Sequence, residues 1–79
     1  MKVRVRYFAA AKAAAGVAEE LREVPGGCSV GTLLASTGLG GHPVLGRSTF
    51  LVNGLTVPGH THVLADGDSL DVLPPFAGG

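Results

Sequence analysis

Apolar and polar residues alternate along Lys2–Phe8, a pattern typical of a half-buried β-strand. One face of this strand is apolar and the other is basic: the apolar face holds Val3, Val5 and Tyr7, and the basic face holds Lys2, Arg4 and Arg6. Residues 9–15 are almost all alanine, the best helix former, and predict a short helix that ends at Gly16.

Residues 18–24 predict a second strand, with Leu21 facing the core. Its three acidic residues suit the edge of a sheet: Glu19, Glu20 and Glu23. After a break at Pro25-Gly26-Gly27, Ser29 is a suitable N-cap for a helix. The spacing i, i+3, i+4, i+7 then places four residues on one helical face, namely Val30, Leu33, Leu34 and Thr37. We expect this uncharged helix to be held mainly by packing.

Turn residues divide the next part of the chain. Residues 38–47 predict a Gly/Pro loop, and Thr49–Val52 predicts a short strand. Asn53-Gly54 is a strong hairpin signal because both residues tolerate positive φ, and residues 55–57 resume the hairpin.

The chain ends with a turn, a strand and a tail. Asp66-Gly67-Asp68 predicts a tight turn before a last strand, Ser69–Leu73, in which Leu70 and Val72 share one face. Pro74-Pro75 ends that strand, because proline cannot donate a hydrogen bond to a sheet. The order of elements predicts an α+β fold in which a mixed sheet packs on one main helix. We therefore expect a single domain over residues 1–73 and an extended, flexible tail over residues 74–79.

Composition narrows the function and the compartment. Six basic residues balance six acidic ones, so net charge gives no argument for nucleic acid or for an anionic membrane. The lone Cys28 excludes an internal disulfide and suits a reducing compartment. No stretch approaches the ~20 apolar residues of a membrane span, and the N-terminus lacks the apolar core of a signal peptide. We expect a cytoplasmic protein.

The residue types of the tail suit a terminal carboxyl group that another protein activates. Pro74-Pro75 favours an extended backbone, and Gly78-Gly79 removes side-chain bulk, so the terminal carboxylate can enter a narrow cleft. A glycine carboxylate becomes an electrophile once it is adenylated, and a β-carbon beside it would crowd the attacking nucleophile. The alternative is a frayed terminus that happens to end in glycine.

Other candidate chemistry is weaker. His60 and His62 supply two of the three or four ligands that a metal site needs, so we expect no metal. Cys28 has no neighbouring cation or base to activate it, and we expect it half-buried beside a helix N-cap. The basic face of the first strand suits either an acidic partner or plain solvent. No pattern of nucleophile and base is evident, so we expect no catalysis by this chain alone.

Several segments together resemble the family of ubiquitin-like sulfur carriers, which includes the small subunit of molybdopterin synthase and the thiamine-pathway carrier. The resemblance covers essentially the whole chain and rests on Val3–Ala9, Ser29–Leu33, Val52-Asn53-Gly54, Asp66-Gly67-Asp68 and the Pro74-Pro75-Phe76-Ala77-Gly78-Gly79 end. The double proline is closer to the molybdopterin branch than to the thiamine branch.

The resemblance implies the β-grasp fold of ubiquitin and a working C-terminus. A ubiquitin-activating-type adenylating enzyme would use ATP to activate Gly79, and a persulfide or rhodanese-type sulfur donor would convert it to a thiocarboxylate. The large subunit of molybdopterin synthase would then take up the tail, and the thiocarboxylate would give its sulfur to the pterin precursor. Gly78 would provide clearance, and the partner-binding residues would be Phe8, Leu73, Pro75, Phe76 and Ala77. The chain itself would bind no cofactor.

Three alternatives stay open from the sequence. In the first, the sulfur acceptor belongs instead to thiamine, cysteine or tRNA thiolation. A ubiquitin-like modifier joined to lysines through Gly79 shares the adenylation step. A plain interaction module with an inert tail is the third.

Overall fold

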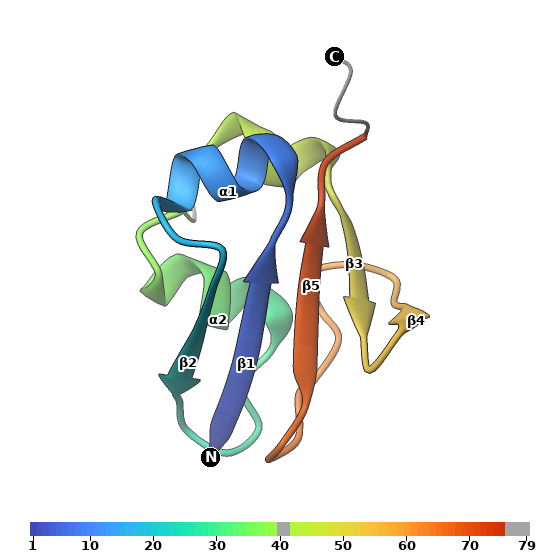
Figure 1. Cartoon of the computed structure of the whole chain (residues 1–79). Helices are drawn as coiled ribbons and strands as arrows, with labels where there is room; N and C mark the ends of the chain where they lie inside the picture. The colour runs from blue at the N-terminus through green and yellow to red at the C-terminus, as the bar shows by residue number, and fades with distance from the viewer. Residues whose placement is uncertain (40–41, 76–79) are drawn as a thin grey trace.

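A computed structural model describes residues 1–39 and 42–75, without the side chain of Val44. Five strands form one mixed sheet in the order β2-β1-β5-β3-β4, in which β1 and β5 are parallel and the other neighbours antiparallel. Figure 1 shows α2 behind this sheet and α1 at the end where β1 and β5 finish. The elements are β1 Lys2–Tyr7, α1 Ala9–Ala15, β2 Glu19–Glu23, α2 Val30–Ser36, a 3-10 helix η1 Pro43–Arg47, β3 Thr49–Val52, β4 Leu55–Thr56 and β5 Ser69–Leu73.

The core lies between the sheet and α2, as the apolar spacing predicts. The predicted inner faces of β1 and β5 are buried: Val3, Val5, Tyr7, Leu70 and Val72. Val30, Leu33 and Leu34 of α2 are also buried, whereas α1 buries only Ala11, so α2 is the main helix of the core. The α+β prediction and the bounds of the strands, to within a residue or two, are confirmed. Within the described residues, neither helix has the length and hydropathy of a membrane span.

The N-terminus of α2 is closed from two sides. The Ser29 hydroxyl accepts a hydrogen bond from the backbone N–H of Thr32, as predicted for an N-cap. The first two helical N–H groups, of Val30 and Gly31, donate to carbonyls of the crossing segment 60–62 at 2.9 Å. A Cβ on Gly31 would lie 3.0 Å from the Cβ of His60, so this close crossing requires the glycine.

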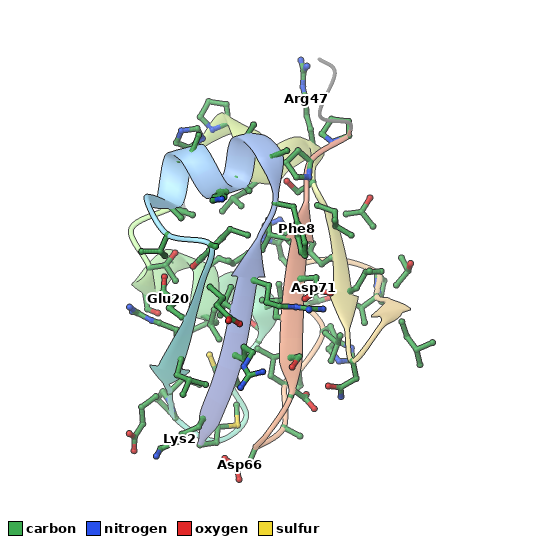
Figure 2. The ribbon with its side chains drawn as sticks, viewed as in Figure 1. Lys2, Phe8, Glu20, Arg47, Asp66 and Asp71 are labelled. Atoms are coloured by element: carbon green, nitrogen blue, oxygen red, sulfur yellow. The ribbon has the colours of Figure 1, made fainter. Side chains whose placement is uncertain are left out.

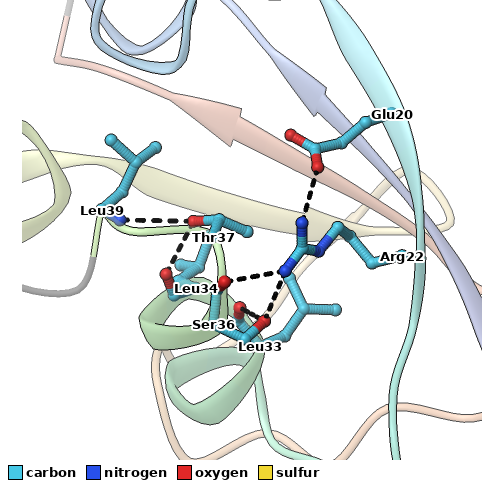
Figure 3. Close-up of polar contacts among 7 residues, drawn as sticks. All are labelled: Glu20, Arg22, Leu33, Leu34, Ser36, Thr37 and Leu39. Atoms are coloured by element: carbon cyan, nitrogen blue, oxygen red, sulfur yellow. Dashed lines mark hydrogen bonds and ion pairs between the residues drawn. The ribbon is translucent and has the colours of Figure 1, made fainter.

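The prediction that Leu21 faces the core is wrong, because 65% of its surface is exposed. In the register of β1 and β2, Leu21 lies opposite Arg4, which points to solvent, so strand alternation turns Leu21 outward as well. Val24, one residue beyond the strand, is buried instead. Figure 3 shows the inward neighbour Arg22, which donates to the Ser36 carbonyl at the end of α2 (2.7 Å). The predicted edge position of this strand is confirmed.

The prediction of a plain loop over residues 38–47 is also wrong. Pro43–Arg47 forms η1, in which the N–H of Leu45 donates to the His42 carbonyl (3.1 Å). Proline suits the first turn of a helix because its missing N–H has no partner there in any case. Leu39 and Leu45 are buried, so burial of these two leucines folds the segment against the core.

Opposite the end where β1 and β5 finish lies the turn end, defined here by Lys2, Asn53 and Asp66–Ser69. The hairpin at Asn53-Gly54 has φ of 51° and 84°, as its sequence predicts. Asp68 accepts hydrogen bonds from the Asn53 side chain (2.9 Å) and the Ala65 N–H (2.8 Å). Asp66 accepts one from the N–H of Lys2, and Asn53 accepts one from the N–H of Ser69. The two predicted turns therefore form one hydrogen-bonded unit.

Candidate functional site: the exit of the last strand

Because β1 and β5 are parallel, they finish at the same edge of the sheet, where the chain leaves toward its tail. We call this the exit end and define it by Arg6–Ala9 and Asp71–Pro75. The N–H of Phe8 donates to the Val72 carbonyl (3.2 Å), which fixes Phe8 beside the last residues of β5. Phe8 and Leu73 both follow the Tyr7–Val72 pair on the outer face of the sheet.

The structure thus brings two of the predicted partner-binding residues together. Phe8 is 39% exposed, Leu73 is half-buried, and Pro75 is exposed after the strand. Pro74-Pro75 follows the end of β5 directly, as predicted. The remaining predicted site residues, Phe76, Ala77, Gly78 and Gly79, lie outside the described residues.

Sequence analysis missed a half-buried ion pair at this end, between an exposed Arg6 and a buried Asp71. The Arg6 Nε donates to Asp71 Oδ1 (2.7 Å) and an Arg6 Nη donates to Asp71 Oδ2 (2.8 Å), a two-pronged arrangement in which the Asp71 side chain is only 7% exposed. These hydrogen bonds and the carboxylate charge raise the pKa of Arg6 above its ordinary value. Figure 2 shows Asp71 on β5, close to Phe8 on the same face.

The pair also reaches Phe8. The Arg6 guanidinium carbon lies 5.8 Å from the centre of the Phe8 ring, within the range of a cation–π contact. Register could have revealed this cluster, since Arg6 and Asp71 are direct partners across β1 and β5. A single sequence predicts the strands but not which strands pair. The Arg6–Asp71 pair could therefore be predicted only once β1 and β5 were known to be neighbours.

The surface at the exit end is hollowed beside Phe8. The hollow measures about 450 Å³ and is lined by Arg6, Tyr7, Phe8, Ala9, Lys12, Ala18 and Glu19. Ala9 holds a φ of 50°, which non-glycine residues rarely adopt. This surface combines an exposed aromatic ring, a hollow and fixed charges, and another protein can dock on it.

The other candidates take structural positions. The His60 ring packs edge-on against Phe50 (5.1 Å, 77°), and no three His, Cys, Asp or Glu side chains within residues 1–39 and 42–75 gather as a metal site would require. Cys28 lies directly before the Ser29 cap, as expected, but it is buried where a half-buried position was expected. The basic face of β1 is exposed but has acidic neighbours: Arg4 lies 3.8 Å from Glu19, and Arg6 binds Asp71.

Known proteins resemble this chain over its whole length. The molybdopterin synthase sulfur carrier subunit of Chlamydomonas reinhardtii is 34% identical, with all of both chains covered. Among solved structures, a Pyrococcus furiosus protein assigned as molybdopterin converting factor subunit 1 is 33% identical with a TM-score of 0.79, covering 96% of this chain and 99% of its own.

Two further structures extend the comparison. The small archaeal modifier protein SAMP1 of Haloferax volcanii is 27% identical with a TM-score of 0.79, and both chains are fully covered. A complex of subunits 1 and 2 of the molybdopterin-converting factor from Helicobacter pylori gives 25% identity and a TM-score of 0.70, also with full coverage. These similarities confirm the ubiquitin-like β-grasp fold expected from the sequence. The ThiS family matches residues 5–79, nearly the entire sequence, so this protein is a member of the ThiS family.

Proposed function

We propose that this protein is a sulfur carrier that serves as the small subunit of a molybdopterin synthase. The observation that carries the proposal is the exit end, where β5 ends beside an exposed Phe8 and the sequence continues through Pro74-Pro75 to a terminal Gly-Gly. The relatives named above support the assignment, since one is a molybdopterin synthase sulfur carrier subunit and another was solved as a complex of subunits 1 and 2.

In this proposal the chemistry takes place at the carboxyl group of Gly79. An adenylating enzyme of the ubiquitin-activating type joins that carboxylate to AMP from ATP and releases pyrophosphate. The outer sulfur of a persulfide donor then attacks the acyl-adenylate and AMP leaves, which joins Gly79 to the donor through an acyl disulfide. A thiol attacks the donor's sulfur in that disulfide, the donor and the thiol leave together as a disulfide, and Gly79 is released as a thiocarboxylate. In the large subunit the thiocarboxylate gives its sulfur to the pterin precursor, and the carboxylate is restored. ATP is thus a substrate of the activating enzyme, and we assign this cycle to the cytoplasm.

The described residues would dock and aim the tail. Phe8 and Leu73 flank the exit on the outer face of the sheet, where a partner can bury them while the tail enters its active site. The Arg6–Asp71 pair ties β1 to β5 two residues before the exit and so fixes the direction in which the chain leaves. Gly78 gives clearance, and Pro75, Phe76 and Ala77 contact the partner. We assign no catalytic group to the chain itself.

A second candidate function is protein modification through an isopeptide bond to Gly79. It is favoured by the similarity to SAMP1, and it shares the adenylation step. The two functions differ in the nucleophile that reacts next, which is a sulfur in the carrier and a lysine amine in the modifier.

The test is the intact mass of the full chain after incubation with its activating enzyme, ATP and a sulfur donor. We expect a gain equal to the exchange of one oxygen for sulfur, located in the C-terminal peptide. Deleting Gly79 should abolish this gain without changing the circular dichroism spectrum. Unchanged mass in the parent protein would overturn the carrier function, and covalent adducts of high mass in a lysate would favour the modifier.

A further inference from the structure

β2 forms the outer edge of the sheet beyond β1 (Figure 1), and an edge strand leaves one row of its backbone groups without a strand partner. Met1 and Val24 exchange hydrogen bonds in both directions, and the Tyr7 N–H donates to the Ala18 carbonyl. Because hydrogen-bonded pairs alternate in an antiparallel ladder, the even-numbered residues of β2 bond to β1. The odd-numbered residues, Glu19, Leu21 and Glu23, turn their N–H and C=O groups outward.

These three residues also present their side chains on one face, in the order acidic, apolar, acidic. Leu21 is 65% exposed at the centre, and both glutamates are exposed. Glu19 lies 3.8 Å from Arg4, but both side chains are more than half exposed, so this contact is weak and leaves the carboxylate open to a second cation. On the opposite face Arg22 already binds Glu20 and the end of α2.

Two hollows adjoin Leu21. One, of about 130 Å³, is lined by Lys2, Leu21, Arg22 and Glu23. The other, of about 300 Å³, runs from Leu21 across β1 and is lined by Lys2, Arg4, Leu21, Gly67, Asp68 and Ser69. Lys2 of β1 lines both hollows, so both lie on the β1 side of Leu21, and they leave its side chain uncovered on the face where an apolar side chain of a partner would pack.

We propose that the free edge of β2 binds an extended basic segment of a partner protein, which adds to the sheet as a sixth strand. The outward N–H and C=O groups supply the ladder, Leu21 receives an apolar side chain, and the two glutamates receive cations two residues to either side. β2 is two strands away from β5, so a partner held there leaves the exit end accessible.

Charge distinguishes this occupant from a second copy of the chain. Two β2 strands paired antiparallel about Leu21 would place Glu19 of each copy opposite Glu23 of the other, and like charges directly opposite destabilise a sheet. A strand with the pattern cation, spacer, apolar, spacer, cation instead meets both carboxylates with opposite charge. The same glutamates could serve only to prevent edge-to-edge aggregation, and that role predicts no peptide binding.

The experiment is a titration of the full-length, ¹⁵N-labelled protein with the capped peptide Thr-Lys-Thr-Val-Thr-Lys-Thr. We expect saturable amide shifts and slowed hydrogen exchange at Glu19, Leu21 and Glu23, with little change in exchange at Glu20 and Arg22. The double change Glu19→Lys and Glu23→Lys should weaken binding about fivefold, as expected for two exposed ion pairs. Leu55→Lys, at an exposed leucine on the opposite edge, is the matched control and should bind normally.

Each contrary outcome overturns the proposal. An absence of saturable shifts would limit the glutamates to preventing aggregation. Equal binding of a peptide with glutamate in place of lysine would exclude recognition by charge. A dimer that forms through β2 without peptide would make a second copy the occupant. The assay involves no sulfur, so its failure and a failure of sulfur loading are independent results.

Discussion

The two ends of the sheet are built differently. At the turn end, side chains and backbone groups hydrogen-bond to one another, and positive φ falls on residue types that tolerate it: Asn53, Gly54 and Gly67. At the exit end a positive φ falls on Ala9, and between β1 and β5 the only side chains among the described residues that bond to each other are those of the Arg6–Asp71 pair. Register is thus fixed at one end, while the other end is left with surface for a partner.

The exit end also holds a buried hydroxyl, that of Tyr7, without a hydrogen bond. The Tyr7 hydroxyl is the only buried side-chain polar atom in the described part of the chain that lacks a hydrogen bond. Glu20 and Thr37 lie close enough to influence the titration of this hydroxyl, but neither meets the geometry of a hydrogen bond with it. Burial first, and the charge of Glu20 second, raise the pKa of Tyr7 to about 12.

We expect the largest effect at alkaline pH. The unfolded chain loses the Tyr7 proton near pH 10, whereas the folded chain keeps it until about pH 12, so the folded state binds more protons in between. The contribution of Tyr7 to the free energy of unfolding is therefore fully present below pH 10, and about 2 kcal/mol of it is lost as the pH rises to 12. Since Tyr7 is the only tyrosine, its phenolate absorbance follows the titration directly, and urea unfolding follows stability.

Tyr7→Phe is the control for that pH dependence. It removes a hydroxyl that has no partner, so at pH 7 the free energy of unfolding should change by less than about 0.5 kcal/mol. Between pH 10 and 12 the free energy of unfolding should fall less in this variant than in the parent protein. The part of the fall that is left should be the part caused by titration of the lysines. A phenolate that appears near pH 10 in the folded protein would contradict the buried position of this hydroxyl.

The next effect belongs to the turn end. Asp68→Ala removes two hydrogen bonds, to the Asn53 side chain and the Ala65 N–H, and should lower the free energy of unfolding by about 2 kcal/mol. For a domain of this size, that is a fall in Tm of about 8–16 °C. Glu23→Ala removes an equal charge from an exposed residue with no such bonds and should change Tm little. Equal losses in the two variants would mean that charge, and not the bonded turn, matters at this end.

Sequence patterns predicted whatever depends on local spacing. The strand Ser69–Leu73, the Ser29 cap and the Asn53-Gly54 hairpin follow from alternation, capping and turn chemistry within a few residues. The failures came where distant segments meet. Leu21 turns outward because of its register with β1. The helix at Pro43–Arg47 forms because Leu39 and Leu45 are buried against the core.

The candidate site divides in the same way. Composition predicted a working tail, which stays a prediction, and the family resemblance pointed to Phe8 and Leu73, which the structure brings together. Asp71 was not recognisable, because its importance comes from pairing with Arg6 across strands that are 65 residues apart in sequence. No local pattern distinguishes this aspartate from an exposed one.

The smallest effect should come from the Arg6–Asp71 pair itself. Asp71→Asn keeps the size of the side chain but replaces one acceptor oxygen with a donor that faces the Arg6 guanidinium. Because Arg6 is about half exposed and can turn to water, we expect a loss of only about 1 kcal/mol in urea unfolding. Asp71→Leu should be no worse, since an apolar residue can replace the buried member of a pair when the other member stays hydrated.

Comparison with Asp68→Ala then decides how the two ends differ. A smaller loss for Asp71→Asn, together with slower sulfur loading of Gly79, would mean that the pair directs the exit end while the turn end supplies the stability. A loss larger than that of Asp68→Ala would invert this order: the strand pair at the exit would then be the main clamp of the sheet, and the hydrogen-bonded turns would only follow the register that Arg6 and Asp71 impose.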